Sequence, residues 1–173
     1  PHWSKGWIIE NNIIAESKSV GISLGTEIGT GHKKQAGKHK KGGTQREQEV
    51  ILRALHAGWH NDNVGSHIIR GNIIYDCEQA GIVGHMGGAF SQIQNNRIYN
   101  IHHKRLRHGA EVGGIKLHAA LDTQMSDNLI YSCYRGIWLD WQAQGTRITR
   151  NVFFDNLSED LFVEVCHGPY LVD

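Results

Sequence analysis

The chain contains 173 residues, of which 18 are Lys or Arg and 17 are Asp or Glu, so its formal net charge is +1. This balance provides no strong field for nucleic acid or an anionic membrane, so neither is expected as a partner. No run of about 18 apolar residues is present, which argues against a membrane-spanning helix. Length alone predicts one domain with a buried core.

Cysteine content and the first residues bear on the compartment. The three cysteines cannot all pair, and small disulfide-stabilised scaffolds use more of them. The N-terminal residues lack the apolar segment of a secretory signal peptide. Both features favour a cytoplasmic protein with reduced thiols.

A short pattern recurs along the chain: an apolar residue, two variable residues, Asn, one further residue, then another apolar residue. Intervals of 24 and 23 residues between successive asparagines match one turn of a parallel β-helix. Each asparagine is expected at an inward-turning corner, where its amide bonds to its stacked neighbours. The sequence therefore predicts an all-β fold, a right-handed parallel β-helix, over residues 1–173. The repeated asparagines are Asn12, Asn72, Asn96, Asn128 and Asn151.

Two intervals are longer than one turn. The 32 residues before Asn128 allow one turn plus a short loop around residues 102–108. The 60 residues before Asn72 require one turn plus an insertion, which is placed at residues 26–59. The β-helix is therefore expected to be interrupted once by a segment with its own structure.

The insertion divides into a loop and a helix. Residues 29–43 are basic and Gly-rich, as is typical of a solvated loop, and no interleaved aromatic residues favour nucleic-acid binding. Residues 44–47, Thr-Gln-Arg-Glu, match a capping box that begins a helix, and Gly58 is expected to stop it. The predicted apolar face of this helix consists of Val50, Ile51, Ala54 and Leu55.

The repeat pattern is already complete within residues 1–12 and starts again at residues 170–173. Solenoids need capping repeats at their ends, and neither end of this sequence shows one. The chain is therefore expected to be part of a longer protein.

A second strand follows each repeated asparagine, with apolar residues alternating toward the core. The outward residue after each apolar pair forms a column, which we call the outer column. Neighbouring parallel strands lie about 4.8 Å apart, so Asp140 and Glu164 are predicted to stand side by side. The outer column consists of Gly25, His85, His118, Asp140 and Glu164.

Paired carboxylates at this spacing are typical of a retaining glycosidase, which holds its two carboxyl groups about 5–5.5 Å apart. One acts as nucleophile, while the other donates and then removes a proton. The alternative is that Asp140 and Glu164 are solvated surface acids. Like charges on adjacent strands repel, however, and a purely structural sequence would usually avoid the pair.

The surroundings of the acids suggest how a sugar would be held. Trp138 and Trp141 offer aromatic faces for a sugar ring, although Trp138 could instead pack over Phe162. The two column histidines could donate hydrogen bonds to sugar hydroxyls, or form half of a metal site with Asp140. No metal-ligand spacing accompanies them, so neither a metal nor a cofactor is predicted. The predicted substrate-binding residues are His85, His118, Trp138, Trp141, Glu111 and His167.

Four segments also resemble the β-helix core of glycoside hydrolase family 120, the β-xylosidases. These segments are residues 67–77, 114–122, 136–145 and 160–169. The resemblance covers most of the chain from His60 onward and is most specific in the last two segments. It implies a retaining enzyme with Asp140 as nucleophile and Glu164 as acid/base, an assignment of roles that spacing alone does not provide. Family members are longer and carry a β-sandwich domain, of which this sequence shows nothing.

The favoured hypothesis is an exo-acting β-xylosidase that cleaves xylose from short xylo-oligosaccharides by double displacement. A polysaccharide lyase or polygalacturonase on the same fold is the alternative, with Lys116 as a base, but Asp140 and Glu164 alone make a poor calcium site. A structural β-helix shaft is a third possibility. The identity of the sugar rests on the resemblance, and assembly as a homo-oligomer is left open.

Overall fold

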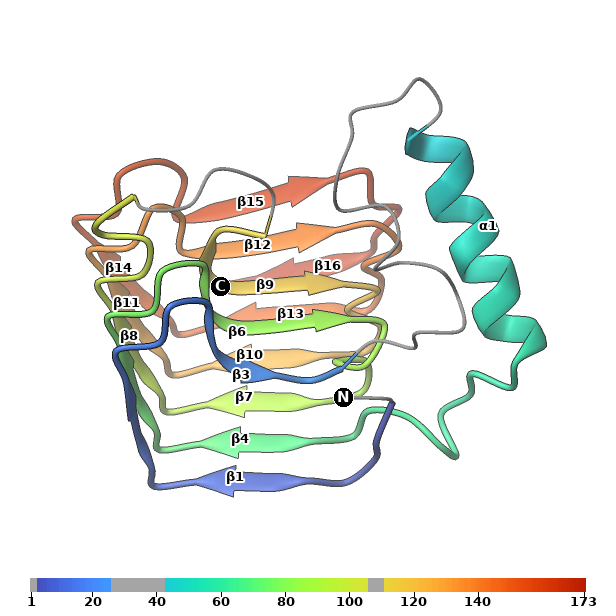
Figure 1. Ribbon diagram of the computed structural model, residues 1–173, viewed down its shortest axis with the longest axis horizontal. Helices are drawn as coiled ribbons and strands as arrows, with labels where there is room; N and C mark the ends of the chain where they lie inside the picture. Colours follow the sequence, from blue (N-terminus) through green and yellow to red (C-terminus); the bar gives the residue numbers. More distant parts are fainter. Residues whose placement is uncertain (1–2, 26–42, 106–110) are drawn as a thin grey trace.

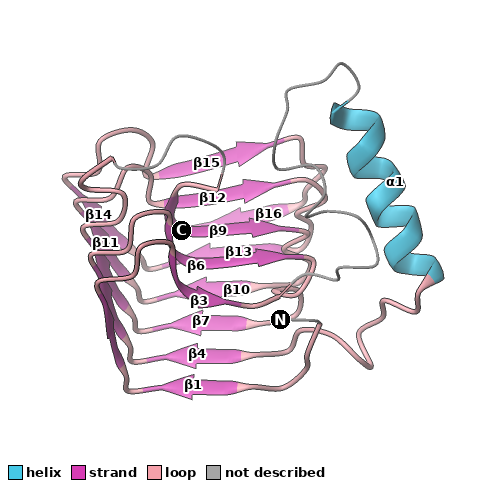
Figure 2. Ribbon diagram, viewed as in Figure 1, coloured by secondary structure: helices cyan, strands magenta, loops and turns pink. Residues whose placement is uncertain are grey.

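The computed structural model describes residues 3–25, 43–105 and 111–173, with helix side chains from Glu47 onward. The predicted basic loop lies outside these residues. The described part forms sixteen short strands and one helix, and Figure 2 shows that strands build the body while the helix stands at its side. Consecutive strands enter three sheets in turn, so each turn of the chain adds one strand to each sheet.

The strands of each sheet stack in parallel, as Figure 1 shows for β6, β9, β12 and β15, which confirms the predicted parallel β-helix. The first sheet consists of β1 (Ile8–Glu10), β4 (Ile68–Arg70), β7 (Gln92–Gln94), β10 (Gln124–Ser126), β13 (Thr146–Thr149) and β16 (Tyr170–Val172). The second consists of β2 (Ile13–Ala15), β5 (Ile73–Tyr75), β8 (Arg97–Tyr99), β11 (Leu129–Tyr131) and β14 (Val152–Phe154). The third consists of β3 (Val20–Ser23), β6 (Ala80–His85), β9 (Gly113–His118), β12 (Ile137–Asp140) and β15 (Leu161–Glu164).

The repeated asparagines occupy the corner between the first and second sheets. The residue before each one has a left-handed backbone, for example Asp127 with φ 58°, and this single residue turns the chain. Each amide then bonds to the asparagine of the next turn: Asn72 Nδ2 donates to Asn96 Oδ1 at 3.0 Å, and Asn96 Nδ2 to Asn128 Oδ1 at 3.0 Å. The predicted asparagine ladder is confirmed.

The core lies between the three sheets and consists mainly of isoleucine. Alternation places Ile82, Ile115 and Ile137 of the third sheet fully inside, as predicted. Val163 belongs to the same set but is 38% exposed, because β15 forms the edge of its sheet. The inward positions of the third sheet are therefore buried from β3 through β12 and more exposed on β15.

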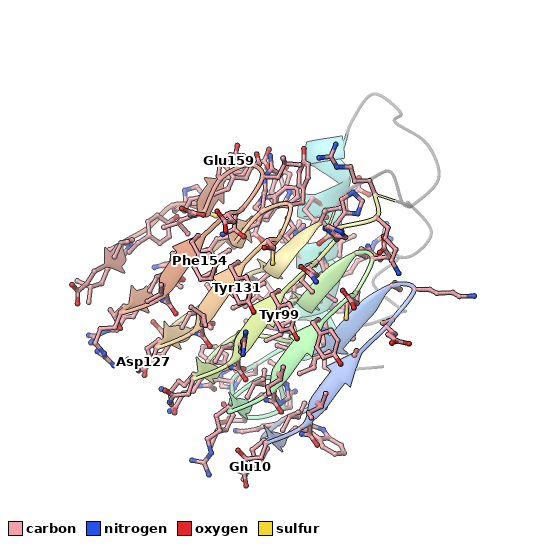
Figure 3. The ribbon with its side chains drawn as sticks, turned by 90° about the vertical axis from the view of Figure 1, so that its left-hand side faces the viewer. Glu10, Tyr99, Asp127, Tyr131, Phe154 and Glu159 are labelled. Atoms are coloured by element: carbon pink, nitrogen blue, oxygen red, sulfur yellow. The ribbon has the colours of Figure 1, made fainter. Side chains whose placement is uncertain are left out.

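Aromatic rings form a stack on the outer face of the second sheet, which was not predicted from the sequence. The centroids of Tyr75 and Tyr99, and of Tyr99 and Tyr131, are 5.0 Å apart, and those of Tyr131 and Phe154 are 4.5 Å apart. Figure 3 shows the last three on successive strands. Because the rings lie face to face, they cover one another and help to hold successive turns in register.

Helix α1 (Gly43–His56) lies beside the ends to which the arrows of the third sheet point (Figure 1). Val50 and Ala54 are completely buried, whereas Leu55 is 52% exposed, so its assignment to the apolar face is wrong. The buried face instead includes Glu47, one turn before Val50. Gly58 follows the helix with φ 88°, as predicted for a stop. The described part of the chain contains no helix with the length and apolar character needed to span a bilayer.

Removing an interior asparagine should destabilise the fold more than removing a terminal one. In Asn96→Ala, the buried backbone N–H and side chain of Asn72 lose their shared acceptor, Asn96 Oδ1. Each unsatisfied buried group costs about 1–3 kcal/mol, so the free energy of unfolding should fall by roughly 3 kcal/mol in urea titrations. The control is Asn12→Ala, at the exposed end of the ladder, which should cost less than about 1 kcal/mol. Equal losses in both variants would contradict this role of the ladder.

Candidate active site

The register of the third sheet brings the outer column together as predicted. His85 pairs with His118, His118 with Asp140, and Asp140 with Glu164, each through their Cα positions. The backbone N–H of His85 donates to the carbonyl of Gly25 at 3.1 Å, which extends the column by one turn. Since adjacent parallel strands are about 4.8 Å apart, Asp140 and Glu164 are immediate neighbours.

The outer column points away from the core but is largely covered. Ile137 and Leu139 enter the core, so Asp140 lies on the opposite face of β12, yet its exposed fraction is only 7%. The residues after His85, His118, Asp140 and Glu164 have a left-handed backbone, for example Met86 with φ 64° and Ala119 with φ 52°. Ala54 and Ile51 of helix α1, together with Trp59 just after the helix, pack with Met86 and Ala119 at these corners. The helix thus closes over the histidine half of the column.

The two carboxylate oxygens of Asp140 differ in their contacts with the described residues. Lys116 Nζ donates to Asp140 Oδ2 at 2.5 Å, and His118 Nε2 lies 3.5 Å from the same oxygen. Oδ1 is buried, and no described residue forms a hydrogen bond with it. One carboxylate oxygen is therefore anchored, while the other is buried without a hydrogen-bond partner among the described residues.

Glu47 from α1 joins this site, although the sequence assigned it only to a helix cap. Its Oε1 lies 2.7 Å from His85 Nε2 and 3.6 Å from His118 Nδ1. His118 Nε2 in turn lies 3.0 Å from Glu111 Oε1. The cap itself involves Thr44, whose side chain is outside the described part. The signal for Glu47 was its spacing, since it shares a helix face with Val50 and Ala54.

These contacts change the protonation of the buried groups. Burial alone would lower the pKa of His118, but hydrogen bonds to Glu111 and Glu47 outweigh it and raise the pKa to about 9. Burial would raise the pKa of Glu47, but His118 and His85 hold it well below its ordinary value. For Lys116 burial prevails and lowers the pKa, against the opposing charges of Glu111 and Asp140. His118 is therefore an imidazolium between two carboxylates at neutral pH.

The cluster of Glu47, His85 and His118 contains residue types that bind metal ions. Ligand-type atoms of Glu47, His85 and His118 lie within 4.8 Å of one another. Two ligands of a tetrahedral zinc ion, each about 2.0–2.1 Å from the metal, would stand about 3.3 Å apart, whereas Glu47 and His85 are at hydrogen-bond distance. A ligating histidine must also be neutral, whereas the hydrogen bonds to Glu111 and Glu47 raise the pKa of His118. Charge and geometry favour an ion-pair network.

The other predicted substrate-binding residues have different positions. Trp138 is 8% exposed and packs between Lys116 Nζ, 3.5 Å from its ring centroid, and the guanidinium of Arg135, at 4.5 Å. It is also tilted against Phe162, with centroids 5.6 Å apart, as the packing alternative expected. Trp141 is half-buried directly after Asp140, and Glu111 reaches the column through His118. His167 lies exposed in the segment after β15.

A match to a known protein family defines the structural class of the chain. A family model described as a right handed beta helix region matches residues 49–170. This match covers more than half of the chain, so the protein belongs to the right-handed β-helix family. The handedness expected from the sequence is thereby confirmed. A search of curated proteins found no match.

A solved structure provides a more particular relationship. The chain is similar to the structure described as "The complex structure of XylC with xylose", with 54% sequence identity over 100% of this chain and a TM-score of 0.94. The chain spans 27% of the XylC chain, about a quarter of its length. This match confirms the resemblance to the β-helix core of glycoside hydrolase family 120.

The charge network predicts a pH-dependent stability that requires Glu47. Because the folded-state pKa of His118 is raised from 6.5 to about 9, its contribution to stability is complete below pH 6.5 and is lost as pH rises through 9. In Glu47→Gln the pKa of His118 should fall, so less stability should be lost between pH 6.5 and 9.5. At pH 6 this variant should lose about 3 kcal/mol of unfolding free energy, measured by urea titration.

Glu49→Gln is the matched control, since Glu49 lies on the same helix and pairs only with the exposed side chain of Arg53 among the described residues, at 3.5 Å. It should change the unfolding free energy by less than about 0.5 kcal/mol. If Glu47→Gln keeps the full pH dependence of the wild type, Glu47 does not control the protonation of His118.

Proposed function

We propose that the protein is the catalytic core of a retaining glycoside hydrolase that releases xylose from the non-reducing end of short xylo-oligosaccharides. The observation that carries this proposal is the pairing of Asp140 with Glu164 on adjacent strands. A separation of about one strand spacing suits the 5–5.5 Å that retaining enzymes use. The 54% identity to XylC, which was solved with xylose, supports this sugar.

The reaction proceeds by two displacements at the anomeric carbon. Asp140 attacks this carbon through Oδ1, while Glu164 donates its proton to the departing glycosidic oxygen, and a xylosyl ester of Asp140 forms. Glu164, now a carboxylate, removes a proton from water, which attacks the same carbon and breaks the ester bond. Asp140 returns as a carboxylate, Glu164 regains its proton, and xylose leaves with its original configuration.

The burial of the two acids suits these roles. Asp140 is enclosed, with its anchored oxygen turned to Lys116 and His118, as expected of a nucleophile that must meet the sugar in one orientation. Glu164 is only half-buried at the edge of the third sheet. The less buried carboxylate, Glu164, suits the acid/base role, which requires contact with both the leaving group and water.

The covered end of the column supports exo action. Helix α1 places Glu47 against His85 and His118, so the column is covered on the histidine side. A sugar chain that enters such a site can place only its terminal unit beside Asp140. His85, His118 and Glu111 supply the polar atoms that would meet the hydroxyl groups of this unit.

Replacing Asp140 should abolish turnover, and added azide should restore reaction by attacking the face of the sugar that Asp140 occupied. Asp140→Gly should lower kcat/KM for an aryl β-xyloside by about 10⁴-fold or more. Added azide should then attack from the vacated side and yield α-xylosyl azide, detected by NMR. Asp155→Gly is a control on an exposed residue whose φ of 52° already suits glycine, and it should keep wild-type activity. Retained activity in Asp140→Gly would exclude Asp140 as nucleophile.

Replacing the acid/base should depend on the leaving group. Glu164→Ala should slow hydrolysis of xylobiose by about 10²–10⁴-fold, because the departing sugar must be protonated. An aryl xyloside with an acidic phenol should form the xylosyl ester almost normally, and azide should convert this ester to β-xylosyl azide. Equal losses for both substrates would argue against proton donation by Glu164. Calcium-dependent release of unsaturated products would instead favour the polysaccharide lyase.

A further inference from the structure

Lys116 is the largest side chain that is completely buried among the described residues, although it points away from the apolar core. It lies on β9, two residues before His118, and its strand neighbour on β12 is Trp138. Its Nζ reaches Asp140 Oδ2 at 2.5 Å and lies 3.5 Å from the centre of the Trp138 ring. The ammonium is thus enclosed between a carboxylate and an aromatic face.

Stability does not explain why this position holds a lysine. Removing an ammonium from water costs several kcal/mol, and buried ion pairs can often be replaced by apolar residues of similar size without loss of stability. The lysine aliphatic chain could be replaced by methionine, which would pack on Trp138 equally well. Its charge, by contrast, acts on Asp140, whose other oxygen has no hydrogen-bond partner among the described residues.

We propose, on the basis of the function proposed above, that Lys116 is a positioning residue for the reaction. By binding Asp140 Oδ2, it fixes the rotation of the carboxylate and leaves Oδ1 as the attacking oxygen. A carboxylate that was free to rotate would present either oxygen and spend less time aligned with the anomeric carbon. Lys116 does not touch the sugar, and it acts only through Asp140.

Charged groups from several parts of the chain surround the Lys116 ammonium and the Asp140 carboxylate. His118 lies on the same strand as Lys116 and contacts Asp140 Oδ2. Arg135 lies on the Trp138 ring that also contacts Lys116. Further described groups near Lys116 or Asp140, directly or through His118, include Glu111, Glu164, Glu47, His85 and Cys166. Among the cations, Lys116 is the closest to Asp140, since His118 Nε2 is 1 Å farther from Oδ2 by the two distances of 2.5 and 3.5 Å.

The test is the pH profile of kcat/KM for an aryl β-xyloside in Lys116→Met, made in the full-length protein. The acidic limb of the profile should move to higher pH by about 1–3 units, because an adjacent positive charge has been removed. At the optimum, kcat should fall about 10²-fold, with KM within about threefold of the wild type. Lys116→Arg retains the charge and should keep the wild-type acidic limb.

Arg135→Met is the matched control, because it removes the second cation on the Trp138 ring but does not contact Asp140. It should leave the acidic limb and kcat unchanged within about threefold. Urea unfolding of each variant separates these effects from a general loss of structure.

Two results would overturn the inference. A Lys116→Met variant that unfolds at lower urea concentration but keeps the acidic limb and kcat would make Lys116 a structural residue. If the acidic limb of the pH profile moves equally in Lys116→Met and Arg135→Met, the effect comes from the loss of any nearby positive charge and not from the contact between Lys116 and Asp140. In both cases the wild type still hydrolyses the xyloside, and the proposed function stands. A wild type without glycosidase activity would overturn the proposed function and this inference together.

Discussion

The register between successive turns is the constraint on which the site depends. A shift of one residue between β12 and β15 would turn Asp140 or Glu164 into the core and separate the two carboxylates. The asparagine ladder at one corner and the aromatic stack on the second sheet both prevent such a shift, because each links equivalent positions of successive turns. The repeated fold therefore sets the distance between the two carboxylates.

The electrostatics of the site depend on helix α1, which shields part of the outer face of the third sheet from solvent. Helix α1 closes over the histidines, and burial then makes each charge pair strong and each unpaired charge costly. Positive and negative groups alternate as a result, from Glu47 through His118 to Asp140 and Lys116. In such a chain Asp140 is held in one orientation, whereas a solvated aspartate on the surface of a β-helix would not be.

The parts of the fold and site that follow a local period could be predicted from the sequence. The interval between asparagines predicted the turns, and two-residue alternation placed Asp140 and Glu164 on one face. The contribution of Glu47 could not be predicted in this way, because α1 folds back on β6 and β9 from an insertion whose path has no period. The pairing of Lys116 with Asp140 required knowledge of what covers the outer face, and Leu55 was misassigned because the centre of the buried helix face depends on the same packing.

The most direct test of the paired-carboxylate site is to trap the glycosyl-enzyme. A 2-deoxy-2-fluoro-β-xyloside with a good leaving group should form a stable ester, because the fluorine slows both displacements and the good leaving group restores only the first. Peptide mapping by mass spectrometry should then locate the sugar on Asp140, in the segment that contains Trp138 and Trp141. A label on Glu164, or turnover without any covalent intermediate, would contradict the assignment of Asp140 as the nucleophile of a retaining enzyme.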